Sequence, residues 1–203
     1  YIDYVDVIKN GNCIARLNGP FTSGLPSGEK VRAKVRVNFG WNREEEYVHW
    51  LGQLKVSGGE ILSYQTCFRG AAFTSPQPGE TAFKTRVNRV TGSDAEHVGL
   101  DLYSSKNPNV TTPAYQGIIL DLLMSPDGTI TADVNGQQFT YTLRELFEGS
   151  KAHFMRGWLS EAVQFERACP EEAFTIGCSF SDEGAERDCD YYYVRVRQRD
   201  GQW

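Results

Sequence analysis

The chain has 203 residues and a formal net charge of −5 at pH 7, with 20 Gly and 8 Pro distributed along its length. This composition is typical of an ordered globular protein with many turns, and we expect a single domain over residues 1–203. The acidic balance argues against a nucleic-acid partner, because such binding needs a basic face to displace counterions from phosphates. No apolar run approaches the roughly 18 residues that cross a bilayer, so we expect no membrane partner.

Apolar and polar residues alternate with period two along most of the chain. Between residues 30 and 39 every second side chain is apolar and most of the others are basic, which predicts a strand with one face on a core. Less regular runs predict further strands, at 47–56, 60–68, 81–90, 97–103, 116–124, 129–134, 137–142, 153–166, 173–180 and 190–199. Between them lie pairs with turn chemistry, at Asn10-Gly11, Gly58-Gly59, Pro126-Asp127-Gly128, Asn135-Gly136 and Asp200-Gly201.

Residues 118–143 predict a three-stranded meander with turns at Pro126-Asp127-Gly128 and Asn135-Gly136. Only residues 143–149 predict a helix, with Thr142 as its N-cap and Gly149 as its stop. This pattern predicts an all-β protein, an antiparallel, jelly-roll-like β-sandwich with one short helix near 143–149, and a closed barrel is the lesser alternative.

Both ends of the sequence suggest a fragment of a longer protein. Tyr1 opens in mid-strand, and the strand at 190–199 runs into an Asp-Gly turn after which the sequence stops. We therefore expect this last strand to show either an unpaired edge or a partner strand supplied from elsewhere.

Several segments resemble one family: residues 2–11, 37–41, 50–59, 140–146 and, most specifically, Asp190-Tyr-Tyr-Tyr-Val-Arg-Val-Arg-Gln-Arg-Asp-Gly-Gln-Trp203. They resemble the β-rich C-terminal region that follows a PHP-type metal-dependent hydrolase domain in large bacterial proteins. The resemblance implies an accessory role beside a phosphoesterase-like or amidohydrolase-like domain of the same polypeptide. The metal motifs of that domain do not occur here, so no catalytic residue is carried over.

The five cysteines, Cys13, Cys67, Cys169, Cys178 and Cys189, contain no C-x-x-C pair and cannot all be bridged within one chain. We expect free thiols, which favour a reducing, cytoplasmic compartment over others without deciding the localisation. A disulfide between two of the last three cysteines stays open.

Catalytic patterns are sparse. The three histidines lie far apart in the sequence, although alternation places His97 on one strand face with Asp101 and Tyr103, near Asp94 and Glu96. That set could hold a metal or form an acid-base pair, but an ordinary solvated sheet face is the favoured interpretation. There is no G-x-S-x-G elbow either, so we expect neither catalytic residues nor a cofactor.

Two sets of residues are candidates for ligand binding. Trp41 and Tyr115 fall in turn-like contexts where aromatic rings could face a glycan, whereas Trp50 and Trp158 fall in mid-strand and predict core positions. The predicted strands at 30–39, 81–90 and 190–199 point basic side chains outward. If these strands are adjacent they form a cationic wall for a small anionic ligand or an acidic domain, and the alternative is a solvated face paired with Asp and Glu. The residues of that wall are Lys30, Arg32, Lys34, Arg36, Lys84, Arg86, Arg195, Arg197 and Arg199.

The acidic stretch at 181–190 is a weak candidate for a calcium site, formed by Asp182, Glu183 and Asp188 around a glycine. A solvated loop is the favoured alternative. The sequence as a whole predicts a non-catalytic accessory or interaction domain of a larger hydrolase, with a carbohydrate-binding module acting through exposed aromatics as the alternative function.

Overall fold

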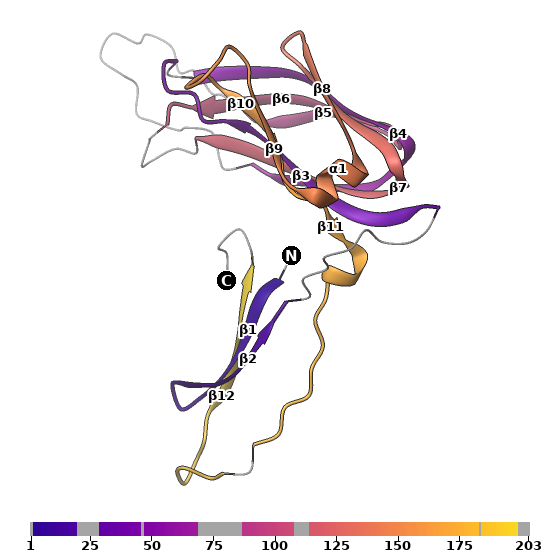
Figure 1. Cartoon of the computed structure of the whole chain (residues 1–203). Coiled ribbons are helices and arrows are strands. Elements are labelled where there is room, and N and C mark those ends of the chain that lie inside the picture. The colour runs from indigo at the N-terminus through magenta and orange to yellow at the C-terminus, as the bar shows by residue number, and fades with distance from the viewer. Residues whose placement is uncertain are drawn as a thin grey trace, which may run out of the picture. The chain divides into compact units, whose positions relative to one another are not determined.

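The computed structural model describes residues 2–19, 29–45, 47–68, 87–107, 114–182 and 184–198 (Figure 1). Contacts divide the chain into two compact units, one formed by Tyr1–Pro26 with Cys169–Trp203 and the other by Ser27–Ala168. We call them unit 1 and unit 2. The single domain over residues 1–203 stays a prediction.

Unit 1 is built on a three-stranded antiparallel sheet in the order β12-β1-β2. Its strands are β1 (Ile2–Lys9), β2 (Asn12–Asn18) and β12 (Tyr192–Gln198), drawn in indigo and yellow in Figure 1. The predicted turn at Asn10-Gly11 joins β1 to β2, and both residues have positive φ, 51° and 89°. The predicted last strand is thus confirmed as β12, which pairs with β1 and has no second partner among the described residues.

Two predictions at the C-terminal end had other outcomes. The Asp200-Gly201 turn lies outside the described residues. The strand predicted at 173–180 is wrong, because the chain there forms the 3-10 helix η1 (Glu171–Ala173), after the short β11 (Cys169–Pro170), and then runs without pairing to residue 182.

Unit 2 is a larger antiparallel sheet in which β3 pairs with β7 and β10, as its alternating pattern at 30–39 predicts. Strand order is β5-β6-β4-β7-β3-β10-β9, with β8 pairing to β7. The bounds are β3 (Val31–Gly40), β4 (Tyr47–Cys67), β5 (Arg89–Ser93), β6 (His97–Ser105), β7 (Tyr115–Val134), β8 (Gln137–Thr142), β9 (Lys151–Phe154) and β10 (Ala162–Phe165).

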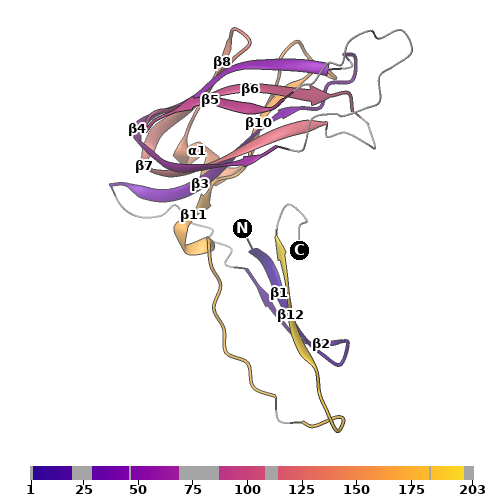
Figure 2. The same ribbon diagram turned by 180° about the vertical axis from the view of Figure 1, so that it is seen from behind.

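The two long strands β4 and β7 pass through both layers of this sheet. Gly52–Ser57 pair with Thr129–Val134, and Gly59–Cys67 pair with Gly117–Met124, with an irregularity between the two stretches. One half of each strand lies with β5, β6 and β8, and the other half lies with β3, β9 and β10. Figures 1 and 2 show this folded-over sheet from opposite sides.

Glycines make the bend in these strands feasible. Gly58 has a φ of 83°, and a Cβ on Gly59 would lie 2.0 Å from the Cβ of Met124. We predicted that turns at Gly58-Gly59 and at Pro126-Asp127-Gly128 separate strands, and both predictions are wrong, because β4 and β7 continue through these residues and pair with each other on both sides of the bend. The Asn135-Gly136 turn between β7 and β8 is confirmed.

The helix α1 (Leu143–Glu148) has Thr142 as its N-cap and ends before Gly149, as predicted. A capping box fixes the N-terminal end, because Thr142 Oγ1 accepts from the Glu145 amide at 3.2 Å while the Glu145 carboxylate accepts from the Thr142 amide at 2.8 Å. Its side chains Leu143, Leu146 and Phe147 join the core between the layers. No helix in the part of the chain that the structure describes is long and apolar enough to cross a membrane.

The core of unit 2 is a single apolar cluster to which both layers of the sheet and α1 contribute side chains. The strands contribute, among others, Ala33, Val35, Val37, Phe39, Trp50, Leu54, Leu100, Leu102, Leu120, Leu122, Ile130, Ala132 and Phe165. The chain is therefore an all-β protein with antiparallel sheets and one short helix, as the sequence predicts. A jelly-roll-like connection of the strands stays a prediction.

Candidate functional site

An exposed apolar tip stands out on the hairpin that joins β9 to β10. Trp158 is 80% exposed, and Leu159 and Phe154 are 41% and 40% exposed. The rings of Phe154 and Trp158 meet edge to face, with centroids 5.1 Å apart and an interplanar angle of 62°. We call these three side chains the aromatic tip. Large apolar side chains that gather in the open commonly mark a binding surface.

The backbone of this hairpin is held in an unusual conformation. Leu159 has a φ of 78° and Gly157 a φ of 115°, and the left-handed region is costly for a residue such as Leu. Ser160 offsets that cost, because its hydroxyl donates to the Gly157 carbonyl at 2.7 Å and accepts from the Arg156 amide at 3.0 Å. The turn is therefore pinned by its own hydrogen bonds.

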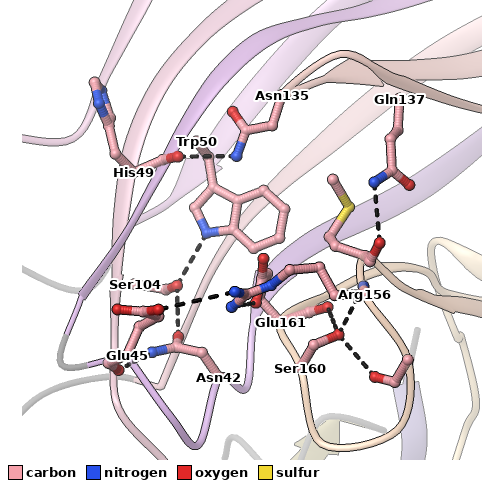
Figure 3. Close-up of polar contacts among 12 residues, drawn as sticks. Asn42, Glu45, His49, Trp50, Ser104, Asn135, Gln137, Arg156, Ser160 and Glu161 are labelled. Carbon is pink, nitrogen blue, oxygen red and sulfur yellow. Dashed lines mark hydrogen bonds and ion pairs between the residues drawn. The ribbon is translucent and has the colours of Figure 1, made fainter.

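A chain of polar contacts connects the hairpin region to the core of unit 2 (Figure 3). The Trp50 indole donates to Ser104 Oγ at 2.9 Å, and that hydroxyl donates to Asn42 Oδ1 at 3.1 Å. Asn42 Nδ2 in turn donates to the Glu45 carbonyl at 2.5 Å, and the Glu45 carboxylate lies 3.8 Å from Arg156. All three side chains at the inner end are buried.

Arg156 forms the outer end of these contacts. Its guanidinium donates to the Glu161 carboxylate at 2.9 Å, which raises the pKa of Arg156 through that hydrogen bond. Figure 3 shows Arg156 between Glu45 and Glu161. The aromatic tip is thus carried on a turn whose flanks are fixed on both sides.

Sequence reasoning missed this surface. We predicted one strand over 153–166 with Trp158 in the core, and both parts are wrong, because β9 ends at Phe154 and β10 begins at Ala162. Gly157 could have indicated the turn, because glycine is rare inside a strand and here it interrupts the alternation of apolar and polar residues. The companion expectation for Trp50 is confirmed, since that ring is fully buried.

The two aromatic residues predicted to face a ligand contact each other instead. The Trp41 and Tyr115 rings stack with centroids 5.0 Å apart and an interplanar angle of 19°, and both are half-buried. The guanidinium of Arg36 lies 5.9 Å from the centre of the Tyr115 ring. The structure thus brings three of the predicted ligand-binding residues together, but one face of each stacked ring is taken by the other ring.

The described strands of the predicted cationic wall are not adjacent in one sheet. Arg32, Lys34 and Arg36 lie on β3, whose neighbours are β7 and β10, while Arg195 and Arg197 lie on β12 beside β1. The third predicted strand, at 81–90, lies mostly outside the described residues, including Lys84 and Arg86, and so does Arg199.

Carboxylates and amides engage several of these basic side chains. Arg32 donates to both oxygens of Asp121, at 3.0 and 2.9 Å, and Arg36 donates to Asn38 at 2.9 Å with Glu166 at 3.6 Å. Lys34 is half-buried on the same strand and Arg197 is exposed. The face is therefore largely paired, as the alternative interpretation expected.

In unit 1 the buried carboxylate of Asp6 is held by two arginines from neighbouring strands. Arg16 donates to it at 2.6 Å and Arg195 at 2.7 Å. The hydrogen bonds from Arg16, and then from Arg195, hold the pKa of the Asp6 carboxyl well below its usual range. This cluster joins all three strands of the small sheet.

The acidic stretch proposed for calcium surrounds a lysine of the protein itself. Lys9 is 1% exposed, and its ammonium lies 2.6 Å from Asp182 and 3.2 Å from Asp190 and donates to the Gly184 carbonyl. These contacts, with the Asp182 hydrogen bond foremost, raise the pKa of Lys9. Asp188 is exposed, and Glu183 lies outside the described residues. No group of three or more His, Cys, Asp or Glu side chains that could hold a metal is found in the described ranges.

The histidines are engaged with separate partners. His97 and Asp101 alternate with the core residues of β6, as predicted, but His97 Nδ1 lies 2.7 Å from Asp94, whereas Asp101 contacts His49 at 2.8 Å and Arg89 at 2.7 Å. The pairing of His97 with Asp101 that was considered for a metal or for acid-base chemistry is therefore not formed. Burial raises the pKa of Asp101, but the hydrogen bonds from His49 and Arg89 outweigh it and leave that pKa below its usual value. His153 stacks on Phe139 with centroids 4.6 Å apart and hydrogen-bonds Tyr141. All five cysteines are free.

No protein-family model matches this chain, and no curated protein or solved structure matches it either. The class of this protein is thus given by its fold alone: it is an all-β protein with antiparallel sheets. The resemblance to the region that follows PHP-type hydrolases stays a prediction.

Proposed function

We propose that this chain is a non-catalytic accessory domain that docks, through the aromatic tip on its β9–β10 hairpin, onto a metal-dependent hydrolase domain of the same polypeptide. The observation that carries the proposal is the exposure of Trp158 on a pinned turn. The identity of the partner rests on the sequence resemblance.

Trp158 has the properties of an interface anchor. Tryptophan is enriched among the few interface residues that dominate binding, and such residues typically contribute more than about 2 kcal/mol each. A turn whose backbone is already held in place loses little conformational freedom when the partner arrives. The hydrogen bonds of Ser160 and Arg156 therefore favour tight docking.

The geometry of the titratable groups supports a non-catalytic role. His97 and Asp94 form one pair, His49 and Asp101 another with Arg89, and His153 lies among aromatic rings. The three histidines thus have separate partners and do not gather in one group, which favours a non-catalytic role.

The first test is to sequence the gene upstream of the codon for Tyr1. The same reading frame should encode a hydrolase domain with paired His and Asp metal motifs. A different neighbour contradicts the proposed partner.

The second test is calorimetric titration of this chain with that separately expressed hydrolase domain. Trp158→Ala should weaken binding by about 30-fold or more. Tyr64→Ala removes another exposed aromatic ring from unit 2 and should leave binding unchanged. Equal binding of the wild type and Trp158→Ala would show that the tip is not the interface.

A carbohydrate-binding module is the second candidate function, favoured by the free surface of the Trp158 indole, because such rings stack on pyranose faces. Binding of insoluble polysaccharides in a pull-down that Trp158→Ala abolishes would support it. Retention of polysaccharide by Trp158→Ala would exclude the tip as the glycan site.

A further inference from the structure

A second surface of unit 2, formed by β4, β6 and β7, carries an open depression of about 530 Å³. This volume is within the range typical of small-molecule sites. Seven of its eight lining residues have polar side chains: Gln53, Lys55, Ser57, Glu96, His97, Thr129 and Thr131, with Val56 as the eighth.

The strand pattern explains why the surface is polar. On β4, Gln53, Lys55 and Ser57 alternate with the core residues Leu54 and Val56, so they point away from the core. On β7, Thr129 and Thr131 alternate with core residues in the same way.

Cross-strand register aligns these side chains in rows. Lys55 lies opposite His97 on one side and opposite Thr131 on the other, and Thr131 lies opposite Thr140 of β8. The hydroxyls of Thr131 and Thr140 are 2.8 Å apart. A row of side chains with donors and acceptors therefore crosses four strands.

The β5–β6 turn forms a fixed edge of the depression. The Asp94 carboxylate accepts from the amides of Glu96 at 2.8 Å and His97 at 2.9 Å. The Val56 amide of β4 donates to the Glu96 carbonyl at 2.8 Å. Glu96 and His97 thus project from a backbone that is already ordered.

The charges around the depression disfavour an anionic ligand. Lys55 is paired with Asp133 at 2.9 Å, and His97 is paired with Asp94 at 2.7 Å. No ion pair of the Glu96 carboxylate is found among the described residues. The surface is therefore net negative whether or not His97 is protonated, which disfavours an anion.

We propose that this depression binds a neutral polyhydroxylated ligand, a single sugar unit or a small polyol. Hydroxyl groups both donate and accept, and so do the threonine and serine hydroxyls and the Gln53 amide that line the depression. None of the eight lining residues is aromatic, so affinity comes from hydrogen bonds and is in the millimolar range. The site is separate from the aromatic tip, so the inference goes beyond the proposed function.

Proton NMR of the histidine rings tests this inference directly, because the chain has only three histidines and one lines the depression. The whole chain is titrated with glucose, galactose, mannose and glycerol, and separately with sulfate. We expect a saturable shift of the His97 ring signals with at least one polyol, while the His49 and His153 signals stay in place. No His97 shift with any polyol at about 50 mM, or an equal shift with sulfate, would overturn the proposal.

Isosteric variants locate the contact. Thr129→Val and Thr131→Val each remove one hydroxyl and should weaken binding about 5-fold, the usual effect of one hydrogen bond. Thr66→Val, on the exposed distal part of β4, is the matched control and should bind as the wild type does. Unchanged affinity in both site variants would contradict the assignment.

Two further experiments distinguish a free sugar from a unit of a glycan, and this site from the aromatic tip. A trisaccharide of the binding sugar that keeps the affinity identifies a unit of a glycan, whereas loss of affinity identifies the free sugar. Trp158→Ala should leave the His97 shift intact, so that failure of the aromatic-tip proposal and failure of this one are distinguishable.

Discussion

The ammonium of Lys9 lies 2.6 Å from the carboxylate of Asp182, although 173 positions separate the two residues in the chain. Tyr192 donates to the same carboxylate at 2.5 Å, and Asn10 donates to Asp190 at 2.7 Å. The stretch before β12 is thereby fastened to the end of β1. A positive charge that the protein itself supplies thus pairs with Asp182, one of the three residues considered for calcium.

Replacement of Lys9 by Met should destabilise unit 1. The aliphatic stem is kept, but the carboxylates of Asp182 and Asp190 lose their shared partner and repel each other. Thermal unfolding should show a lower Tm, and amide exchange of β1 and β12 should accelerate. Lys30→Met, at an exposed position, is the control. A Tm equal to that of the wild type would contradict the role of Lys9.

Acid should weaken unit 1 through Asp6. The folded pKa of this carboxyl lies below its unfolded value near 4, so the ion pairs contribute fully above that value. Their contribution is lost as the pH falls through the depressed folded pKa. Amide exchange of β1, compared between wild type and Asp6→Asn from pH 7 to pH 2, should show a difference that shrinks on acidification. A difference that is constant over this range would argue against linkage to Asp6.

Ser104→Ala should destabilise unit 2 by about 1–3 kcal/mol, because it leaves the buried Trp50 indole and the Asn42 carbonyl oxygen without their partner. Urea denaturation measures the change. Ser63→Ala, at an exposed position of β4, should change the free energy of unfolding by much less. If the two variants were equally stable, the buried contact would have no energetic role.

Gly59→Ala should be poorly tolerated, at a cost of about 3 kcal/mol or more, because the new Cβ would lie 2.0 Å from the Met124 Cβ and 2.6 Å from the Leu123 carbonyl oxygen. Gly149→Ala is the matched control, since a Cβ there meets nothing within 4 Å. Soluble expression and urea denaturation compare the two. A Gly59→Ala protein as stable as the control would show that the bend can shift.

Local patterns in the sequence predicted the elements that local physics determines. Alternation between residues 30 and 39 specified β3, and Thr142 and Gly149 specified the two ends of α1. The Asn135-Gly136 pair specified a tight hairpin, because both residues accept positive φ.

Features that depend on distant partners could not be predicted in this way. Turn chemistry at Gly58 and at Pro126-Asp127-Gly128 fits a hairpin and a bend equally well, and only pairing with the opposite strand distinguishes them. The cation for Asp182 comes from the other end of the chain. Trp158 is exposed because β9 ends before it and β10 begins after it, and the apolar character of the segment gave no sign of this break.

Because β4 and β7 each run through both layers, the two layers cannot be separated without cutting both of these strands. Most of their pairings join residues far apart in the sequence. The entropy cost of closing long loops therefore comes before the favourable free energy of strand pairing, and we expect this unit to fold slowly. The continuous strands also transmit disorder, since melting of one half removes the edge on which the other half is built. Unit 2 is therefore indivisible in its folding, and shorter versions of it made for experiments must keep Tyr47–Cys67 and Tyr115–Val134 complete.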